Sequence, residues 1–300
     1  MPSTDLARSG PPTQAGPPAP ASAGAGGPVG DDTATVITRA TRRRKKPLWV
    51  RALPWATTIA LIAFVELLSR LGVFPEEVPS FTSVVGAALE VIPTPEFLES
   101  LWATLEQFAV GLAIGVVIGV ALGVALGTIP LLYQLLHYVL DFMRFIPAVV
   151  YLPLLLLVMG ARPGVAYILA AVGAVWPMLF QTYYGVVGIP QILKDTGRVF
   201  GLTNAQRLRH VVIPSVSPFL ATGLRIAAAH ALVVVVAVEI ITTVIGLGRD
   251  IAVYSSNGIY PEMYALVGVV GILGLLINWG LESLERWQLH WHSSYREVTA

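Results

Sequence analysis

The chain contains no cysteine and few charged side chains. Without cysteine in its 300 residues, disulfide bonds and thiolate metal sites are excluded. Charged residues make up 12% of the sequence, whereas soluble domains contain about a quarter, and hydrophobic residues make up 55%. The mean hydropathy of +0.71 agrees with this balance. These proportions exclude an ordinary soluble domain and indicate a polytopic helical membrane protein.

Lysine is also scarce, and the motifs of common catalytic sites are missing. The only lysines are Lys45, Lys46 and Lys194, and none of them ends a glycine-rich phosphate-binding loop. No Gly-x-Ser-x-Gly nucleophile motif occurs, and the five histidines show no metal-ligand spacing. We therefore expect no catalytic residue, metal site, cofactor or nucleic-acid partner. If the protein transports actively, its energy comes from an ion gradient or from a separate ATPase.

Residues 1–50 differ from the rest of the chain. Up to about residue 41 they are rich in Pro, Gly, Ala, Ser and Thr, with almost no large apolar residues. Such a segment buries too little surface to offset its ordering entropy, so we expect a disordered tail. The basic run at residues 42–46 predicts that this tail is cytoplasmic. Binding of the run to anionic membrane lipid is the alternative interpretation.

Six apolar segments are long enough to cross a bilayer core, which takes roughly 20 helical residues. The sequence therefore predicts an all-α fold with six transmembrane helices, at about 52–72, 103–128, 133–159, 164–187, 219–246 and 263–284. The expected domains are 51–78, with the first helix and the start of an external loop, and a transmembrane domain at 79–290. A cytoplasmic loop is expected at 188–218, and external loops at 73–102 and 247–262.

The distribution of Lys and Arg predicts the orientation of these helices. If the N-terminus is cytoplasmic, the inside regions hold eight, zero, four and two Lys/Arg, and the outside regions hold zero, one and one. Cytoplasmic loops of membrane proteins carry an excess of Lys and Arg. The asymmetry therefore places the 188–218 loop in the cytoplasm.

Glycine recurs at every fourth position of the second predicted helix, at residues 111, 115, 119, 123 and 127. This spacing makes a smooth ridge along which another backbone can approach closely. Packing against a helix of the same chain is the favoured interpretation. A sliding or dimer surface is the alternative.

Proline interrupts the third predicted helix at Pro147 and Pro153. Irregular backbone at membrane depth is tolerated where it lines a cavity or is buried in protein, so both prolines are candidates for a translocation path, or simple packing kinks. Glu239 in the fifth helix has no local partner, so it either lines the path or pairs with another helix. Local ion pairs are expected between Glu66 and Arg70 and between Asp141 and Arg144.

The predicted cytoplasmic loop is more polar than a simple turn requires. A first short amphipathic helix is expected from about 192 to 200, ended by Gly201, because glycine favours the left-handed conformation at helix ends. Thr203 and Gln206 have the spacing of a capping box and predict a second helix to about residue 212, which exposes Arg207 and Arg209. Such a pair of helices fits recognition by a partner protein. A helix pair lying on the membrane surface is the alternative.

This loop resembles the Glu-Ala-Ala-x3-Gly-x9-Ile-x-Leu-Pro signature of permease subunits of ABC importers. The matching positions are Asp195-Thr196-Gly197, Gly201 and the stretch from Val211 through Ile213 to Pro214, with Asp-Thr-Gly in place of Glu-Ala-Ala. Stretches such as Phe145-Ile-Pro147, Val238-Glu239 and Gly246-Leu-Gly248 are similar to the branch that imports nitrate, sulfonates, taurine, bicarbonate or pyrimidine-type thiamin precursors. The resemblance covers about residues 79–290.

The resemblance implies a type I importer fold in the bacterial cytoplasmic membrane and a chain that is not itself an enzyme. It implies a second permease subunit, expected as a homodimer partner, together with a cytoplasmic ABC ATPase dimer and an extracytoplasmic solute-binding protein. The expected ATPase-coupling residues are Asp195, Thr196, Gly197, Gly201, Arg207, Ile213 and Pro214. One alternative is a stand-alone gradient-driven carrier, although the inverted repeats typical of such carriers are not visible. A membrane-embedded structural or signalling protein without transport is the other.

Overall fold

The computed structural model describes residues 48–75 and 77–288, which form helices and connections without any strand. The predicted all-α fold is confirmed for this part of the chain. The chain divides into two units, Met1–Pro54 and Trp55–Ala300. The predicted tail at residues 1–50 lies outside the described residues, except where the first helix begins at Leu48.

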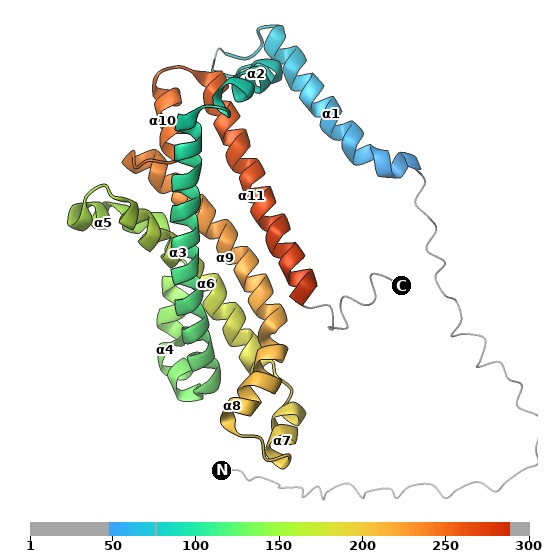
Figure 1. The fold of residues 1–300 in the computed structure, drawn as a ribbon, viewed down its shortest axis with the longest axis vertical. Helices are drawn as coiled ribbons and strands as arrows, with labels where there is room; N and C mark the ends of the chain where they lie inside the picture. Colours follow the sequence, from blue (N-terminus) through green and yellow to red (C-terminus); the bar gives the residue numbers. More distant parts are fainter. Residues whose placement is uncertain (1–47, 76, 289–300) are drawn as a thin grey trace, which may run out of the picture. The chain divides into compact units, whose positions relative to one another are not determined.

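Figure 1 shows the helices in chain order. They are α1 (Leu48–Arg70), α2 (Phe81–Val91), α3 (Pro95–Thr128), α4 (Pro130–Met143), the 3₁₀ helix η1 (Ala148–Tyr151), α5 (Leu152–Met159), α6 (Pro163–Val187), α7 (Gln191–Val199), α8 (Asn204–Arg207), the π-helical turn η2 (Leu208–Val212), α9 (Ile213–Thr242), α10 (Leu247–Ser256) and α11 (Tyr260–Gln288).

The number of membrane spans agrees with the sequence. Five helices of the described chain are long and apolar enough to cross a membrane: α1, α3, α6, the continuous helix Ala205–Thr242 and α11. The α4 helix and the helical segment Ala148–Met159 also meet this criterion together, but they are bent by 83° at a short break. Counted as one broken span, this pair completes the six spans predicted.

Two expected external loops are largely helical. The predicted 73–102 loop contains α2 and the first turns of α3, where Thr94 caps the helix and Pro95 occupies its first turn. This is the start signal of a helix, because proline has no N–H that would need a partner there. The predicted 247–262 loop contains α10, which packs against α3, α9 and α11. With 11 and 10 residues, α2 and α10 are both too short to span a membrane.

The centre of the bundle is formed by α3, α6 and α9, with α6 in contact with both of the others (Figure 1). The glycine ridge of α3 faces α6. A Cβ atom added at Gly115 would lie 2.6 Å from the Ala174 Cβ, and one added at Gly119 would lie 2.6 Å from the Met178 Cβ. Real Cβ atoms do not approach so closely, so the ridge allows two helices of one chain to touch. Internal packing, the favoured interpretation, is confirmed.

The third span is broken as predicted, but its two prolines act differently. Non-helical residues from Arg144 to Pro147 separate α4 from η1. Pro153 lies in the first turn of α5, where proline is well tolerated. Pro147 therefore belongs to the break, whereas Pro153 starts a helix and does not kink one.

Candidate functional site

The turn between α7 and α8 has the local geometry that the sequence predicts. Gly201 has φ +65°, the left-handed conformation, and the Leu202 N–H donates to the Gly197 carbonyl at 3.0 Å. This is the hydrogen bond of a glycine-terminated helix end. The Thr203 N–H donates to Gln206 Oε1 at 2.9 Å, and the Gln206 N–H donates to Thr203 Oγ1 at 3.3 Å. The predicted capping box is therefore formed.

The second helix of the loop does not end at residue 212, however. The π-helical turn η2 joins α8 to α9, so one helix runs from Ala205 to Thr242. Ile213 and Pro214 form the first turn of α9 within this helix, and Pro218 lies inside it. The sequence suggested a stop because proline often begins a new helix, but a π turn can absorb the irregularity inside a continuous one.

The three residues at the Glu-Ala-Ala positions lie on two sides of α7. Asp195 is exposed and accepts a hydrogen bond from Gln191 Nε2 at 3.1 Å. Thr196 is also exposed, and its hydroxyl donates to the Ile192 carbonyl at 2.7 Å. Gly197 is buried, and a Cβ there would lie 3.4 Å from Cγ of Arg207. Asp195 and Thr196 are thus accessible, whereas Gly197 packs toward the side-chain stem of Arg207.

Apolar side chains remain exposed around Asp195. Ile192, Val199 and Phe200 are 73%, 86% and 76% exposed. Together with Gln191, Asp195 and Thr196 they line a shallow surface groove of about 420 Å³. Large apolar side chains gathered beside a polar rim mark an interaction surface. We call this surface, residues 191, 192, 195, 196, 199 and 200, the α7 face.

A larger groove lies at the break of the third span. Its volume is about 800 Å³, and its walls come from the break with η1, from α6 and from α9. The lining residues are Arg144, Phe145, Ile146, Pro147, Ala148, Val149, Gly173, Trp176, Pro177, Phe180, Gln181, Ile226, Ala229, His230, Val233 and Val234. Of the two prolines proposed for a path, Pro147 lines this groove and Pro153 does not. We call it the break groove.

Polar groups are few in the break groove. The guanidinium of Arg144 lies 4.9 Å from the ring centroid of Phe180 and 5.0 Å from that of Phe145. Its Nη2 lies 3.5 Å from Oδ1 of Asp141, so the expected ion pair is formed. The other expected pair, between Glu66 and Arg70, is formed at 2.7 Å. Arg144 is therefore held over an aromatic wall of the groove.

Glu239 is fully buried away from the break groove. Its carboxylate accepts hydrogen bonds from the Thr104 hydroxyl at 2.9 Å, from Gln107 Nε2 at 3.1 Å and from the Gly248 N–H at 2.9 Å. Thr104 and Gln107 belong to α3, and Gly248 to α10. Glu239 thus has the partners on other helices that the sequence left open. It joins α3, α9 and α10.

Residues 115–289 match the family described as binding-protein-dependent transport system inner membrane component. The chain belongs to this family. The match begins inside the glycine ridge and includes the break groove, the α7 face and Glu239, whereas the Thr104 and Gln107 partners of Glu239 precede it. Multi-pass membrane location, predicted from hydropathy, agrees with the inner-membrane description of the family and with the apolar helices.

Several relatives of this permease family are named transport proteins. The nitrate import permease protein of Leptolyngbya laminosa is 31% identical over 59% of this chain and 63% of its own length. The corresponding protein of a Synechocystis strain is 28% identical over 81% of this chain and 93% of its own. A putative aliphatic sulfonates transport permease protein of Escherichia coli is 27% identical over 82% and 94%. The first matches thus span less than two thirds of the curated relatives, and others span nearly all.

The fold is also found among solved structures. The MetNI methionine ABC transporter in an inward facing conformation contains a chain with a TM-score of 0.57 and 23% sequence identity. The similarity covers 63% of this permease and 94% of that chain. At this identity the comparison shows the fold alone, and the predicted type I importer fold is confirmed.

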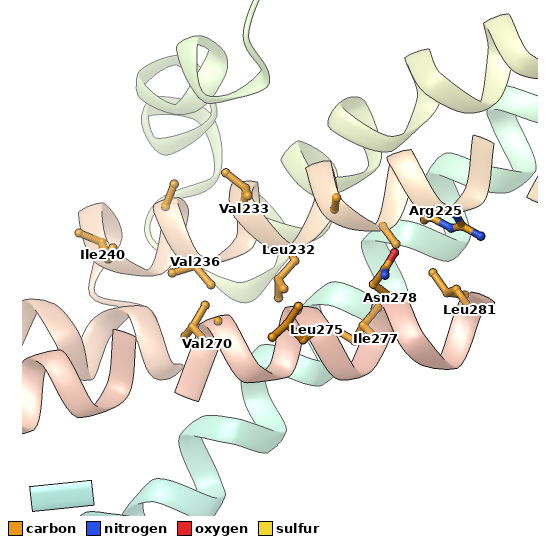
Figure 2. Close-up of a pocket in the computed structure, with 15 residues that line it drawn as sticks. Arg225, Leu232, Val233, Val236, Ile240, Val270, Leu275, Ile277, Asn278 and Leu281 are labelled. Atoms are coloured by element: carbon orange, nitrogen blue, oxygen red, sulfur yellow. The ribbon is translucent and has the colours of Figure 1, made fainter. Parts of the chain in front are cut away.

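Sequence reasoning missed one contact of this permease between distant segments. Arg225 in α9 forms an ion pair with Glu285 in α11, 60 positions away, and Glu285 is buried. Figure 2 shows Arg225 and Asn278 at one end of a second groove, between α9 and α11. The groove has a volume of about 540 Å³, and its other lining residues are apolar. An acid and a base 60 positions apart give no local sequence pattern that predicts such a pair.

Proposed function

We propose that this chain is the membrane permease subunit of an ATP-binding-cassette importer. Its solute is small and of the nitrate, bicarbonate, sulfonate, taurine or pyrimidine-precursor type. Family membership and the names of the relatives support the class of protein. The observation that carries coupling to a separate ATPase is the α7 face, an exposed apolar surface around Asp195 on a polar loop.

The proposed complex lies in the bacterial cytoplasmic membrane with the N-terminus of this chain inside. The Lys/Arg distribution supports this orientation, which puts the α7 face in the cytoplasm. A cytoplasmic ABC ATPase dimer binds there, a second copy of the permease completes the membrane part, and an extracytoplasmic binding protein delivers solute. ATP hydrolysis resides in the ATPase chains.

The path of force from the ATPase to the solute follows one helix. The α7 face moves with the ATPase, and the Gly201 turn joins α7 to the continuous helix Ala205–Thr242. At a rise of about 1.5 Å per residue, this 38-residue helix is about 57 Å long. Five residues of the same helix line the break groove: Ile226, Ala229, His230, Val233 and Val234. A displacement at α7 therefore reaches the groove through a rigid element, which is how packed helices transmit domain motion.

Two variants of the loop test the coupling. Gly201→Pro cannot adopt φ +65°, because proline fixes φ near −65°. Asp195→Arg reverses the charge in the middle of the α7 face. Each variant is reconstituted in proteoliposomes with the ATPase and the binding protein, and ATP hydrolysis stimulated by the loaded binding protein is measured. We expect normal membrane insertion and loss of the stimulated hydrolysis.

Matched controls separate coupling from folding. Gly258 has φ +70°, and it lies just after α10, outside the loop that contains α7 and α8. Gly258→Pro has the same backbone conflict outside the loop and is expected to keep its stimulated hydrolysis if it inserts. Glu90→Arg reverses an exposed charge on α2 and is expected to behave like the parent. Normal stimulated hydrolysis in Gly201→Pro and Asp195→Arg would contradict the proposal.

A further inference from the structure

The break groove contains a cation among apolar walls, and no acidic side chain lines it. Its polar or charged lining side chains are Arg144 from the break, Trp176 and Gln181 from α6, and His230 from α9. Among the described residues, Gln181 and His230 have no side-chain hydrogen-bond partner. Groups left without protein partners in a groove are available to a ligand or to water.

Arg144 is positioned but not saturated. Asp141 approaches one guanidinium nitrogen at 3.5 Å, and the rings of Phe145 and Phe180 hold the plane of the group. A guanidinium carries five N–H donors, so most of them remain after this single contact. The forked donors of a guanidinium can bind two oxygens of a planar or tetrahedral oxyanion at once, and these charge-assisted hydrogen bonds are stronger than those to a neutral ligand.

The groove also lies deep enough to serve a solute that crosses the membrane. At about 1.5 Å per residue, Arg144 lies about 21 Å beyond Pro130, the first residue of α4. Trp176 lies about 20 Å beyond Pro163, the first residue of α6, which runs in the opposite direction in the proposed orientation. Both distances fall well inside a core of about 30 Å. A charged side chain at this depth is costly unless it faces an aqueous cavity or a partner.

We infer that the break groove is a binding site for the transported solute as a small oxyanion, with Arg144 as its counter-charge and Gln181 and His230 as hydrogen-bonding groups. This inference rests on the proposed function and adds the charge and the contacting residues of the solute. Nitrate, bicarbonate and a sulfonate head group share the required chemistry: one negative charge spread over oxygens that accept hydrogen bonds.

The absence of cysteine from the sequence allows a direct test of the charge preference. A single cysteine is introduced by Val149→Cys, at a lining residue of the groove. The full chain with its ATPase is reconstituted and labelled with two thiol reagents of similar size. One reagent carries a sulfonate and the other a trimethylammonium group. Asn257→Cys, an exposed position after α10, calibrates the intrinsic reactivity of the reagents.

We expect Val149→Cys to favour the sulfonate reagent on the order of tenfold, relative to Asn257→Cys, because a nearby fixed cation attracts the anionic reagent. Arg144→Gln should remove this preference, and Arg144→Lys should retain it. An excess of nitrate or ethanesulfonate should slow labelling of Val149→Cys when Arg144 is present. It should have no effect when Val149→Cys is combined with Arg144→Gln. Arg162→Gln, an exposed arginine before α6, is the matched control and should change nothing.

Two readouts distinguish failure of this inference from failure of the proposed function. Equal labelling by both reagents, or a preference that survives in Arg144→Gln, would overturn the oxyanion site. ATP hydrolysis stimulated by the binding protein, measured on the same proteoliposomes, tests the importer itself. If stimulation is present without the charge preference, the importer stands and the site falls. If stimulation is absent, the importer assignment falls and this inference falls with it.

Discussion

The Glu239 carboxylate accepts a hydrogen bond from the Gly248 backbone N–H at 2.9 Å, nine positions further along the chain. This bond folds the turn after α9 back onto α9 and brings α10 against the bundle. Thr104 completes the cluster, because its hydroxyl donates to Glu239 and accepts the Leu247 N–H at 2.9 Å. A buried carboxylate with several donors thus adds to the apolar contacts that Leu247 and Ile251 of α10 make with the bundle.

Removing the carboxylate should loosen this turn. Glu239→Ala leaves the Thr104 hydroxyl and the Gly248 N–H without an acceptor, whereas Gln107 Nε2 keeps the carbonyls of Ala103 and Ile245. Each buried donor left without an acceptor costs about 1–3 kcal/mol. We expect a loss of roughly 2–4 kcal/mol in unfolding free energy, seen as a lower melting temperature of the purified complex. Glu239→Gln keeps one acceptor oxygen and should lose less. Glu90→Ala, an exposed acid on α2, should not change the melting temperature; an unchanged value for Glu239→Ala would show that the cluster contributes little.

The two glycines of the turn should respond differently to a methyl group. A Cβ at Gly246 would overlap the Glu239 carboxyl group, which is the end of a flexible side chain. A Cβ at Gly248 would lie 2.5 Å from the Val236 carbonyl oxygen, which belongs to the backbone and cannot move aside. We expect Gly248→Ala to lower the unfolding free energy by about 1–3 kcal/mol, and Gly246→Ala to lower it less.

A double-variant cycle checks the cause of the Gly246 effect. If the clash is with Glu239, Gly246→Ala should cost little more once Glu239→Ala is already present, so the two losses should not add. Gly248→Ala should remain destabilising in the Glu239→Ala background, because its contact with the Val236 backbone persists. Gly268→Ala, in α11 with open space around the added Cβ, serves as the control. Additive losses for Gly246 and Glu239 would contradict this account.

The ridge of α3 predicts a reciprocal repair. Gly115→Ala places a methyl group 2.6 Å from the Ala174 Cβ and 2.8 Å from the Ala171 carbonyl oxygen, so α3 and α6 must separate. We expect less monodisperse protein after extraction, at a cost of about 1–3 kcal/mol. Ala174→Gly in the same chain should recover part of the loss. Gly280→Ala, on α11 with nothing near the added Cβ, should behave as the parent, and equal yields for Gly115→Ala would refute close contact.

Local chemistry explains which parts of the fold and site were predictable. The bounds of α6 lie within one residue of the predicted span, because apolar residues fill the interval between Pro163 and Gly188. The Gly201 turn and the pairing of Thr203 with Gln206 were also predictable, since each depends on residues within a few positions. The glycine spacing of α3 predicted a close contact, although not that α6 is the helix in contact.

Tertiary contacts explain what the sequence could not predict. Glu239 and Gln107 are 132 positions apart in the sequence, and Arg225 and Glu285 are 60 positions apart. No sequence periodicity predicts either contact. The break groove collects side chains of three segments, and only Pro147 signalled it. The α10 helix is too short and too mixed in polarity to stand out, because packing against α3, α9 and α11 stabilises it.

The Asp-Thr-Gly triplet of α7 yields the last prediction, which concerns the departure from Glu-Ala-Ala. A Cβ at Gly197 would make ordinary contacts, 3.4 Å from Cγ of Arg207 and 3.7 Å from Cδ1 of Leu202. Alanine is also favoured over glycine inside a helix by about 1 kcal/mol. We therefore expect Gly197→Ala to stabilise α7 and to keep ATPase stimulation, measured in the reconstituted complex.

A bulkier residue at the same position separates packing from helix propensity. Gly197→Leu introduces leucine, which favours the helix more than glycine does. The leucine side chain must, however, displace the Arg207 stem from the buried side of α7. We expect it to reduce stimulated hydrolysis at least severalfold. The combined variant Asp195→Glu, Thr196→Ala, Gly197→Ala restores the family pattern and should support stimulated ATP hydrolysis as the parent does, because Asp195 and Thr196 are exposed and Gly197 has room for a methyl group. Loss of coupling in this triple variant would show that the ATPase surface has adapted to Asp-Thr-Gly.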